Sequence, residues 1–438
     1  MLETALNAMA QQYLDLTLCK SRCDESDIQW YTEGPFWRRT SMRYSREYKI
    51  LPDYEIGDMK HGKTLEDVLD EAVHLKNSLE VYKKTARPDE MHRIDYIIDH
   101  VVNLHTRTRL LLGEHMSYNT MTDGMYSLIA PEYGHEMFDR IISDLQQELP
   151  GSGTIQERIA EFRQKITVPP EKLLTVLQGC TQAFHDMSMQ NMAITGNSMP
   201  RVRVRPYPNP KMEFLSILFG YDYNHLEYER NFNSNSIWTA DHIVECIGHE
   251  MEPGHLTYYE KRTQTMIDTC WPEMAVVSLY SSSSAFTEGS ARYVIDLCFD
   301  RSIDKKTDFE REYVFKPAGL DLGLLKTMPL WHRFSEIDGY AKLEATRHLW
   351  DHTWSAEEAL AFLKKYAFVD QKANVDEVYN LAGDMGHFAS HDHARDVVKD
   401  YFDSVADTVQ DQWRLYERLC CSHVSMRGMK DKTYQIDF

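Results

Sequence analysis

Apolar residues recur at helical spacing over most of the first half of the chain. Between Leu65 and Tyr82 they fall three or four positions apart, which is the period of one face of an α-helix. The same period predicts helices over Ile94–Leu112, about Glu136–Leu149, Ile155–Ile166 and Glu171–Met192, the last of which begins after a Pro-Pro pair. We interpret these segments as a helical scaffold.

The pattern changes at "RVRVRPYPNP", residues 201–210. Arg201, Arg203 and Arg205 alternate there with Val202 and Val204, which predicts an extended strand with the arginines on one face. A guanidinium is well shaped to bind a substrate carboxylate, so the three arginines are candidate substrate-binding residues. The alternative is an edge strand whose charges discourage aggregation.

Further short apolar runs, such as "FLSILFGY", follow before helical periodicity resumes near Ala240. It dominates again from Ser335 and includes Ser355–Ala367, where a Ser cap precedes a Glu by three positions. We therefore predict a mainly α protein with a small antiparallel β-sheet inserted near the middle. A single domain would span residues 1–438, with a helical scaffold half (1–195) and a half that carries the sheet (196–438).

Composition narrows the class of protein. The chain has 438 residues, of which 42% are hydrophobic, and this is enough for a large core. No window approaches the roughly 20 apolar residues of a membrane span, and a net charge of −20 argues against a nucleic-acid or anionic-membrane surface. Eight scattered cysteines argue against a disulfide framework. We expect a cytoplasmic protein that binds a small or peptidic ligand.

The candidate chemistry begins at "GHEMEPGH", residues 248–255. Zinc peptidases hold the metal with two histidines on one helical face, and the Glu after the first His acts as general base. Here a regular helix would turn His255 about 600° from His249, or about 240° net, onto the wrong side. Pro253 and Gly254 must therefore bend the backbone if both rings are to meet one ion. Two structural histidines at a helix end are the alternative.

A candidate third ligand lies in "SAFTEGSARYVIDLCF", residues 284–299. The segment predicts a second helix with Glu288 in its first turn, just after a run of serines. A carboxylate at that point could serve the helix dipole alone. It could also bind a metal.

"HEMEPGH" and "TEGSARY" together resemble the double signature His-Glu-x-x-Pro-Gly-His and Glu-Gly-x-Ala-x-Tyr of the domain-of-unknown-function 885 family, a group of zinc peptidase-like proteins. The resemblance covers roughly the second half of the chain. It implies a mostly helical fold and a gluzincin-like site, with Zn²⁺ held by His249, His255 and Glu288 and with Glu250 as general base. Two imidazoles and one carboxylate leave an open position for a water whose pKa the metal lowers.

The chain departs from the family pattern in its late segment. The family's Pro-Gly-Gln run and Tyr-Lys pair are replaced by "GDMGHFASHDHARD", residues 383–396. His387 and His391, together with His393, could supply the missing acid or oxyanion donor. The alternative is that they are polar residues at a helix start. Tyr258 could line the substrate cleft or merely pack, and Arg292 could orient Glu288 or form a surface pair.

Three functions compete on these residues. The first is a zinc-dependent hydrolase that cleaves a peptide or other amide bond by metal-activated water. The second is a di-iron carboxylate oxidase, motivated by Glu252-x-x-His255 with Glu245 and Glu288, because helical bundles build di-iron sites from such pairs. The third is a family member that retains the metal without peptidase activity. We favour the first.

Overall fold

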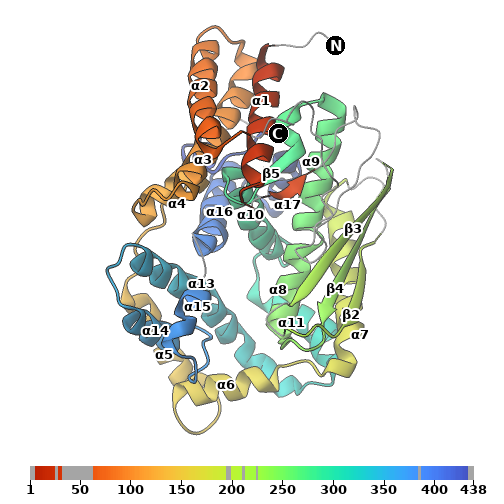
Figure 1. Cartoon of the computed structure of the whole chain (residues 1–438). Coiled ribbons are helices and arrows are strands. Elements are labelled where there is room, and N and C mark those ends of the chain that lie inside the picture. The colour runs from red at the N-terminus through yellow and green to blue at the C-terminus, as the bar shows by residue number, and fades with distance from the viewer. Residues whose placement is uncertain are drawn as a thin grey trace.

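The computed structural model of the chain shows a mainly helical fold with a small sheet (Figure 1). The structure describes residues 5–24, 28–31, 63–193, 199–209, 213–222, 225–382 and 386–432. Among these residues no helix is long and apolar enough to span a membrane. All eight cysteines lie in the described ranges, and none of them forms a disulfide.

The five predicted helices of the first half are confirmed, with ends that move by at most three residues. The structure places helices at α1 Ala5–Ser21, α2 Leu65–Lys83, α3 Met91–Leu111, α4 Tyr118–Tyr126, α5 His135–Glu148, α6 Ile155–Lys165 and α7 Pro170–Asn191. Their starts follow from local chemistry, since Thr64 and Thr154 each form a capping box with the acid three positions later.

Helices also dominate the second half. They are α8 Ala240–Glu250, α9 His255–Thr269, α10 Ser282–Cys298, α11 Ile303–Glu310, α12 Lys316–Ala318, α13 Met328–Trp350, α14 Ala356–Tyr366, α15 Val378–Ala382, α16 Ala394–Val405, α17 Val409–Cys420 and α18 Met426–Lys430. The predicted cap at Ser355 is confirmed, because its side chain accepts from the N–H of Glu358. A π-helical turn, η6 (Ala389–His393), leads directly into α16.

The sheet is mixed, so the prediction of a purely antiparallel sheet was wrong. Its strands are β2 Arg201–Arg205, β3 Phe214–Asp222 and β4 His225–Asn233, in the order β2-β4-β3. β3 and β4 form an antiparallel hairpin, whereas β2 pairs with β4 in parallel. The parallel pair arises because β4 inserts between two strands that are consecutive in sequence. A second, two-stranded antiparallel sheet joins β1 Ile28–Tyr31 to β5 Val276–Ser278.

Buried side chains of the described residues form three hydrophobic cores, and each draws on distant parts of the chain. One joins α1, α2 and α3 to the segment after α9; another joins α5, α6 and α7 to the sheet and to α8, α11, α13 and α14. The third gathers α4, α9, α10, α16 and α17. Residues of the predicted scaffold half and of the second half therefore share cores, and α8, α10 and α16 lie at the middle of the molecule (Figure 1).

Candidate metal centre

The break between the two predicted histidines is a helix end, a tight turn and a new helix start. α8 ends at Glu250 and α9 begins at His255, and the Glu-Pro peptide bond within the turn is cis. The N–H of Gly254 donates to the carbonyl of Gly248 at 3.0 Å, which folds the chain back onto the end of α8. A Cβ on Gly254 would lie 1.9 Å from the carbonyl oxygen of His249. Only glycine permits this close approach.

The turn brings the rings of His249 and His255 to a centroid separation of 4.4 Å. Their Nε2 atoms lie 3.0 Å and 3.1 Å from one oxygen, Oε2 of Glu288. The three donor atoms all lie within 4.8 Å of one another, a spacing that one metal ion can bridge. We call His249, His255 and Glu288 the metal group. Imidazole and carboxylate are ordinary ligands of Zn²⁺, so the donor set fits that ion.

The position of Glu288 within its helix differs from the prediction. α10 begins at Ser282, and the side chain of Ser281 caps it by accepting from the N–H of Ser284. The serines are therefore helical, and Glu288 lies in the second turn instead of the first. A carboxylate that deep in a helix is too far from the N-terminal N–H groups to serve them.

Burial and charge act against each other in the metal group. Burial alone would raise the pKa of Glu288, but the histidines around it, above all His255, hold that pKa well below its usual value. Burial, with the charge of His255, lowers the pKa of His249. Burial also acts to lower the pKa of His255, but the Glu288 charge raises it overall. A neutral His249 beside an ionised Glu288 is the protonation state in which both can bind a metal.

The predicted general base Glu250 is held by an arginine that sequence reasoning missed. Nη2 of Arg230 lies 2.6 Å from Oε2 of Glu250, and the arginine side chain is only 4% exposed. Arg230 projects from β4, where its Cα is paired with that of Val202. The alternation of β4 side chains, with Phe232 also buried, is the sequence signal that would have placed Arg230 on the inner face.

The three predicted substrate-binding arginines lie on the other face of the sheet. Arg201, Arg203 and Arg205 are exposed on the edge strand β2, as the alternation predicts. Nε of Arg203 pairs with Glu229 at 2.6 Å, and Glu229 and Arg230 point to opposite faces because they are neighbours in a strand. This placement favours the edge-strand alternative over contact with a substrate at the metal group.

One of the late histidines does reach the metal group. Nε2 of His391 lies 3.0 Å from the same Oε2 of Glu288, and the side chain is 12% exposed. The ring of His387 lies 4.0 Å from that of His391, measured between centroids, but the His387 residue is exposed. His393 is partly buried, and burial lowers its pKa to about 4. Of the three, His391 alone makes a described contact with a residue of the metal group.

Close packing of α16 on α10 explains how a residue so distant in sequence arrives there. A Cβ on Gly289 would lie 2.6 Å from the backbone carbon of Ala394, so the glycine lets α16 approach. Arg292 also ties α10 to η6, the turn that leads into α16, because its Nη1 lies 2.5 Å from Oδ1 of the buried Asp392. Arg292 thus orients the segment that carries His391 and is not simply a surface pair.

Tyr258 and Glu252 support the site from within the core. Tyr258 is 2% exposed and packs edge-on against Phe286, so the packing alternative fits its position. The Glu252 carboxylate is also buried, and its Oε2 lies 2.5 Å from Nδ1 of His185 on α7. The hydroxyl of Tyr416 donates to the carbonyl of Pro253 at 2.7 Å and fixes the turn from α17.

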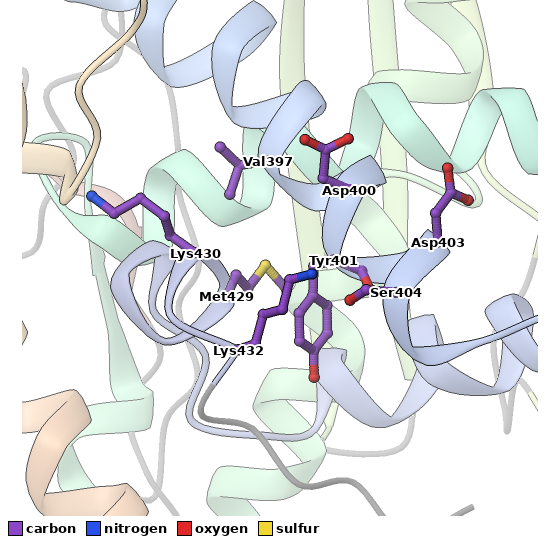
Figure 2. A pocket seen from close by; sticks show the side chains of 8 residues that line it. All are labelled: Val397, Asp400, Tyr401, Asp403, Ser404, Met429, Lys430 and Lys432. Atoms are coloured by element: carbon purple, nitrogen blue, oxygen red, sulfur yellow. The ribbon is translucent and has the colours of Figure 1, made fainter.

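Two surface depressions lie away from the metal group. The larger, about 420 Å³, is lined by side chains of α16 and of the C-terminal segment, among them Asp400, Asp403, Lys430 and Lys432 (Figure 2). The other, about 310 Å³, is formed by α3, α4 and the residues around them. Neither is lined by a member of the metal group.

Comparison with known proteins adds to the fold. No protein-family model matches the chain, and no curated protein matches it in sequence. Among solved structures it is similar to a protein from Colwellia psychrerythraea described as a "putative lipoprotein", with a TM-score of 0.53 and 13% identity over 84% of this chain and 69% of that one. A "putative lipoprotein of unknown function" from Shewanella oneidensis matches with a TM-score of 0.46 and 12% identity, over 84% and 73% of the two chains. The first likeness shows a shared mostly helical fold.

Proposed function

We propose that the protein is a zinc-dependent hydrolase that cleaves a peptide or other amide bond. The observation that carries the proposal is the convergence of His249, His255 and Glu288 from two helix ends and a third helix, with Glu250 next to the first ligand. A zinc ion bound there would activate a water and polarise the scissile carbonyl. The proposal includes distant membership in the domain-of-unknown-function 885 family, supported by the two motifs and the metal group.

Each protein group then has a defined task. His249, His255 and Glu288 bind the ion, and Glu250 accepts a proton from the attacking water and passes it to the leaving amine. Arg230 is a positioning residue, because its Nη2 lies 2.6 Å from Oε2 of Glu250 and so fixes the carboxylate.

The same contacts weigh against the di-iron alternative. A di-iron site needs further carboxylates beside the histidines. Among the described residues the group with metal spacing includes neither Glu252 nor Glu245. Glu252 is paired with His185, and Glu245 is paired with Lys306.

The cytoplasmic location stays a prediction, and cell fractionation would test it against the envelope location that the word lipoprotein suggests for the Colwellia protein.

The experiment compares four full-length proteins after zinc loading: wild type, Glu250→Gln, His249→Ala and Arg203→Ala. Each is assayed for zinc content and for turnover of a mixed peptide pool by mass spectrometry. We expect Glu250→Gln to keep zinc and lose turnover by roughly 100-fold or more, His249→Ala to lose both, and Arg203→Ala to keep both. Turnover that is equal in wild type and Glu250→Gln would overturn the proposal, and so would a wild type that cleaves nothing in the pool.

A further inference from the structure

His391 is held in a tautomer that matters for the metal group. Its Nδ1 lies 2.7 Å from the carbonyl oxygen of His387, four residues earlier. A carbonyl can only accept, so Nδ1 carries the hydrogen and the Nε2 atom of the neutral ring has only a lone pair. That lone pair faces Oε2 of Glu288 at 3.0 Å, and an ionised carboxylate also has only lone pairs to offer. Two acceptors at this distance need a cation or a proton between them.

A second histidine shows what the same local arrangement looks like when no ion is needed. Nδ1 of His100 lies 2.7 Å from the carbonyl of Tyr96, again four residues earlier, but its Nε2 faces the hydroxyl of Ser283 at 2.6 Å. A hydroxyl can donate, so the ring is satisfied on both sides. Tyr96 donates to Ser283, and Arg262 donates to Tyr96, both at 2.8 Å. We call Arg262, Tyr96, Ser283 and His100 the hydrogen-bond chain.

Glu288 offers too few acceptor sites for its neighbours. Nε2 atoms of three histidines, His249, His255 and His391, lie 3.0 to 3.1 Å from a single oxygen. A carboxylate has about four lone-pair sites over its two oxygens, so one oxygen serves about two donors. A metal ion resolves this excess, because it binds the nitrogen lone pairs directly and takes the carboxylate as a further ligand.

We propose that His391 is a fourth protein ligand of the metal, which makes the centre one of three imidazoles and one carboxylate. The proposal rests on the metal centre of the proposed function. A donor bond from the second ring nitrogen to a backbone carbonyl is the usual support of a metal-bound histidine, and His391 has it. His391 lies outside the set of atoms that are all within 4.8 Å of one another, so it is the outermost ligand and would close on the ion by a small movement of its ring.

The assignment changes what the resting centre looks like. With three protein ligands a tetrahedral zinc keeps one open position, whereas with four it is closed. His391 would then fill the position in the absence of substrate and leave it when a substrate carbonyl or water enters. The π-helical turn that carries it, η6, is a backbone feature often found at functional sites.

The experiment measures how many histidine imidazoles bind the zinc ion. Zinc-loaded, full-length wild type is measured by X-ray absorption at the zinc edge, in which each bound imidazole contributes its own scattering. We expect three imidazoles in wild type, two in His391→Ala and three in His387→Ala, the matched control one turn earlier. Zinc affinity should fall in His391→Ala by more than the roughly 10–100-fold that residues outside the ligand shell contribute, and added imidazole should restore the third ligand.

The possible results distinguish the role proposed for His391 from the zinc centre of the proposed function. Two imidazoles in wild type, with the same spectrum in His391→Ala, would overturn the role of His391 and leave the metal centre standing; this is the result expected of a protonated His391 that donates to Glu288. A wild type that binds no zinc, or that binds it equally well as His249→Ala, overturns both. Because the wild-type count is decisive without any variant, poor folding of His391→Ala would not rescue the proposal.

Discussion

Helix α10 carries two buried polar centres, and they differ in how their hydrogen bonds balance. At Ser283 the hydrogen-bond chain runs from Arg262 to His100, and each group in it meets a partner of the opposite kind. At Glu288, five positions along the same helix, three imidazole nitrogens meet one oxygen. Both centres are buried and both contain histidine.

The balance of hydrogen bonds is the feature that distinguishes Glu288, as a candidate metal-binding residue, from Ser283, as part of a structural hydrogen-bond network. Burial, histidine content and hydrogen bonding are shared, so none of them identifies a functional site here. What distinguishes Glu288 is an excess of imidazole nitrogens around one acceptor, which a cation would resolve. The hydrogen-bond chain pairs donors with acceptors from Arg262 to His100 and holds α3 against α10 and α9. The comparison predicts that changes at the two centres will have different effects on zinc binding and on stability.

The largest expected effect is on zinc binding at Glu288. Glu288→Gln keeps the shape of the side chain but removes its charge, and we expect zinc affinity to fall by more than the roughly 10–100-fold that the loss of an outer-shell group costs. Isothermal titration with zinc measures it. Ser283→Ala is the matched control on the same helix, and its zinc affinity should equal that of wild type. Equal losses in the two variants would erase the distinction between the centres.

Moving α16 away from α10 should come next. In Gly289→Ala the new Cβ would meet the backbone of Ala394 at 2.6 Å, so the helices must separate. We expect the free energy of unfolding to fall by roughly 1–3 kcal/mol, as overpacking usually costs. Urea denaturation would measure the loss. Gly319→Ala is a poor control because of its positive φ, but Gly134→Ala, where nothing lies within 4 Å, should leave packing unchanged.

Acid should act on the hydrogen-bond chain through His100. Burial lowers the pKa of His100 to about 3, while the unfolded chain takes up the proton near 6.5. The unfolded state therefore binds more protons between those values, and stability falls as the pH falls. By pH 5 this amounts to about 2 kcal/mol. Urea denaturation at pH 7 and pH 5 should show the loss in wild type and a smaller one in His100→Gln. An identical loss in both would contradict the assignment.

The smallest effect is expected from Tyr96→Phe. Without its hydroxyl, Nη2 of Arg262 still donates to the carbonyls of Glu273 and Val276, and Ser283 still donates to His100. The cost should be about 1 kcal/mol, the net worth of one hydrogen bond. Thermal unfolding measures it, and zinc titration should give the wild-type affinity. A change in zinc affinity larger than the change in stability would show that the two centres are coupled.

Much of the fold could be predicted from the sequence because helical periodicity is local. Helices α2, α3, α5, α6 and α7 follow from apolar spacing and from capping residues such as Thr154, whereas the short α4 was not predicted. The parallel pairing of β2 with β4 could not be predicted, since strand order depends on which segment inserts between two others.

The same limit applies to the site. The sequence could predict His249, His255 and Glu288 as candidate ligands, because all three lie in two short motifs, one of which contains the Pro-Gly break. The partner of Glu250 was not, because Arg230 comes from the sheet and its role depends on which face of the strand meets α8. The contact of His391 with Glu288 depends on how closely α16 packs at Gly289, which is a property of the assembled helices.

An anomalous-difference map at the zinc edge, from crystals of the zinc-loaded protein, would locate the bound ion directly. We expect one strong peak bounded by Nε2 of His249, Nε2 of His255 and the carboxylate of Glu288. Crystals that show no peak between these three side chains, or zinc bound only elsewhere on the molecule, would contradict it.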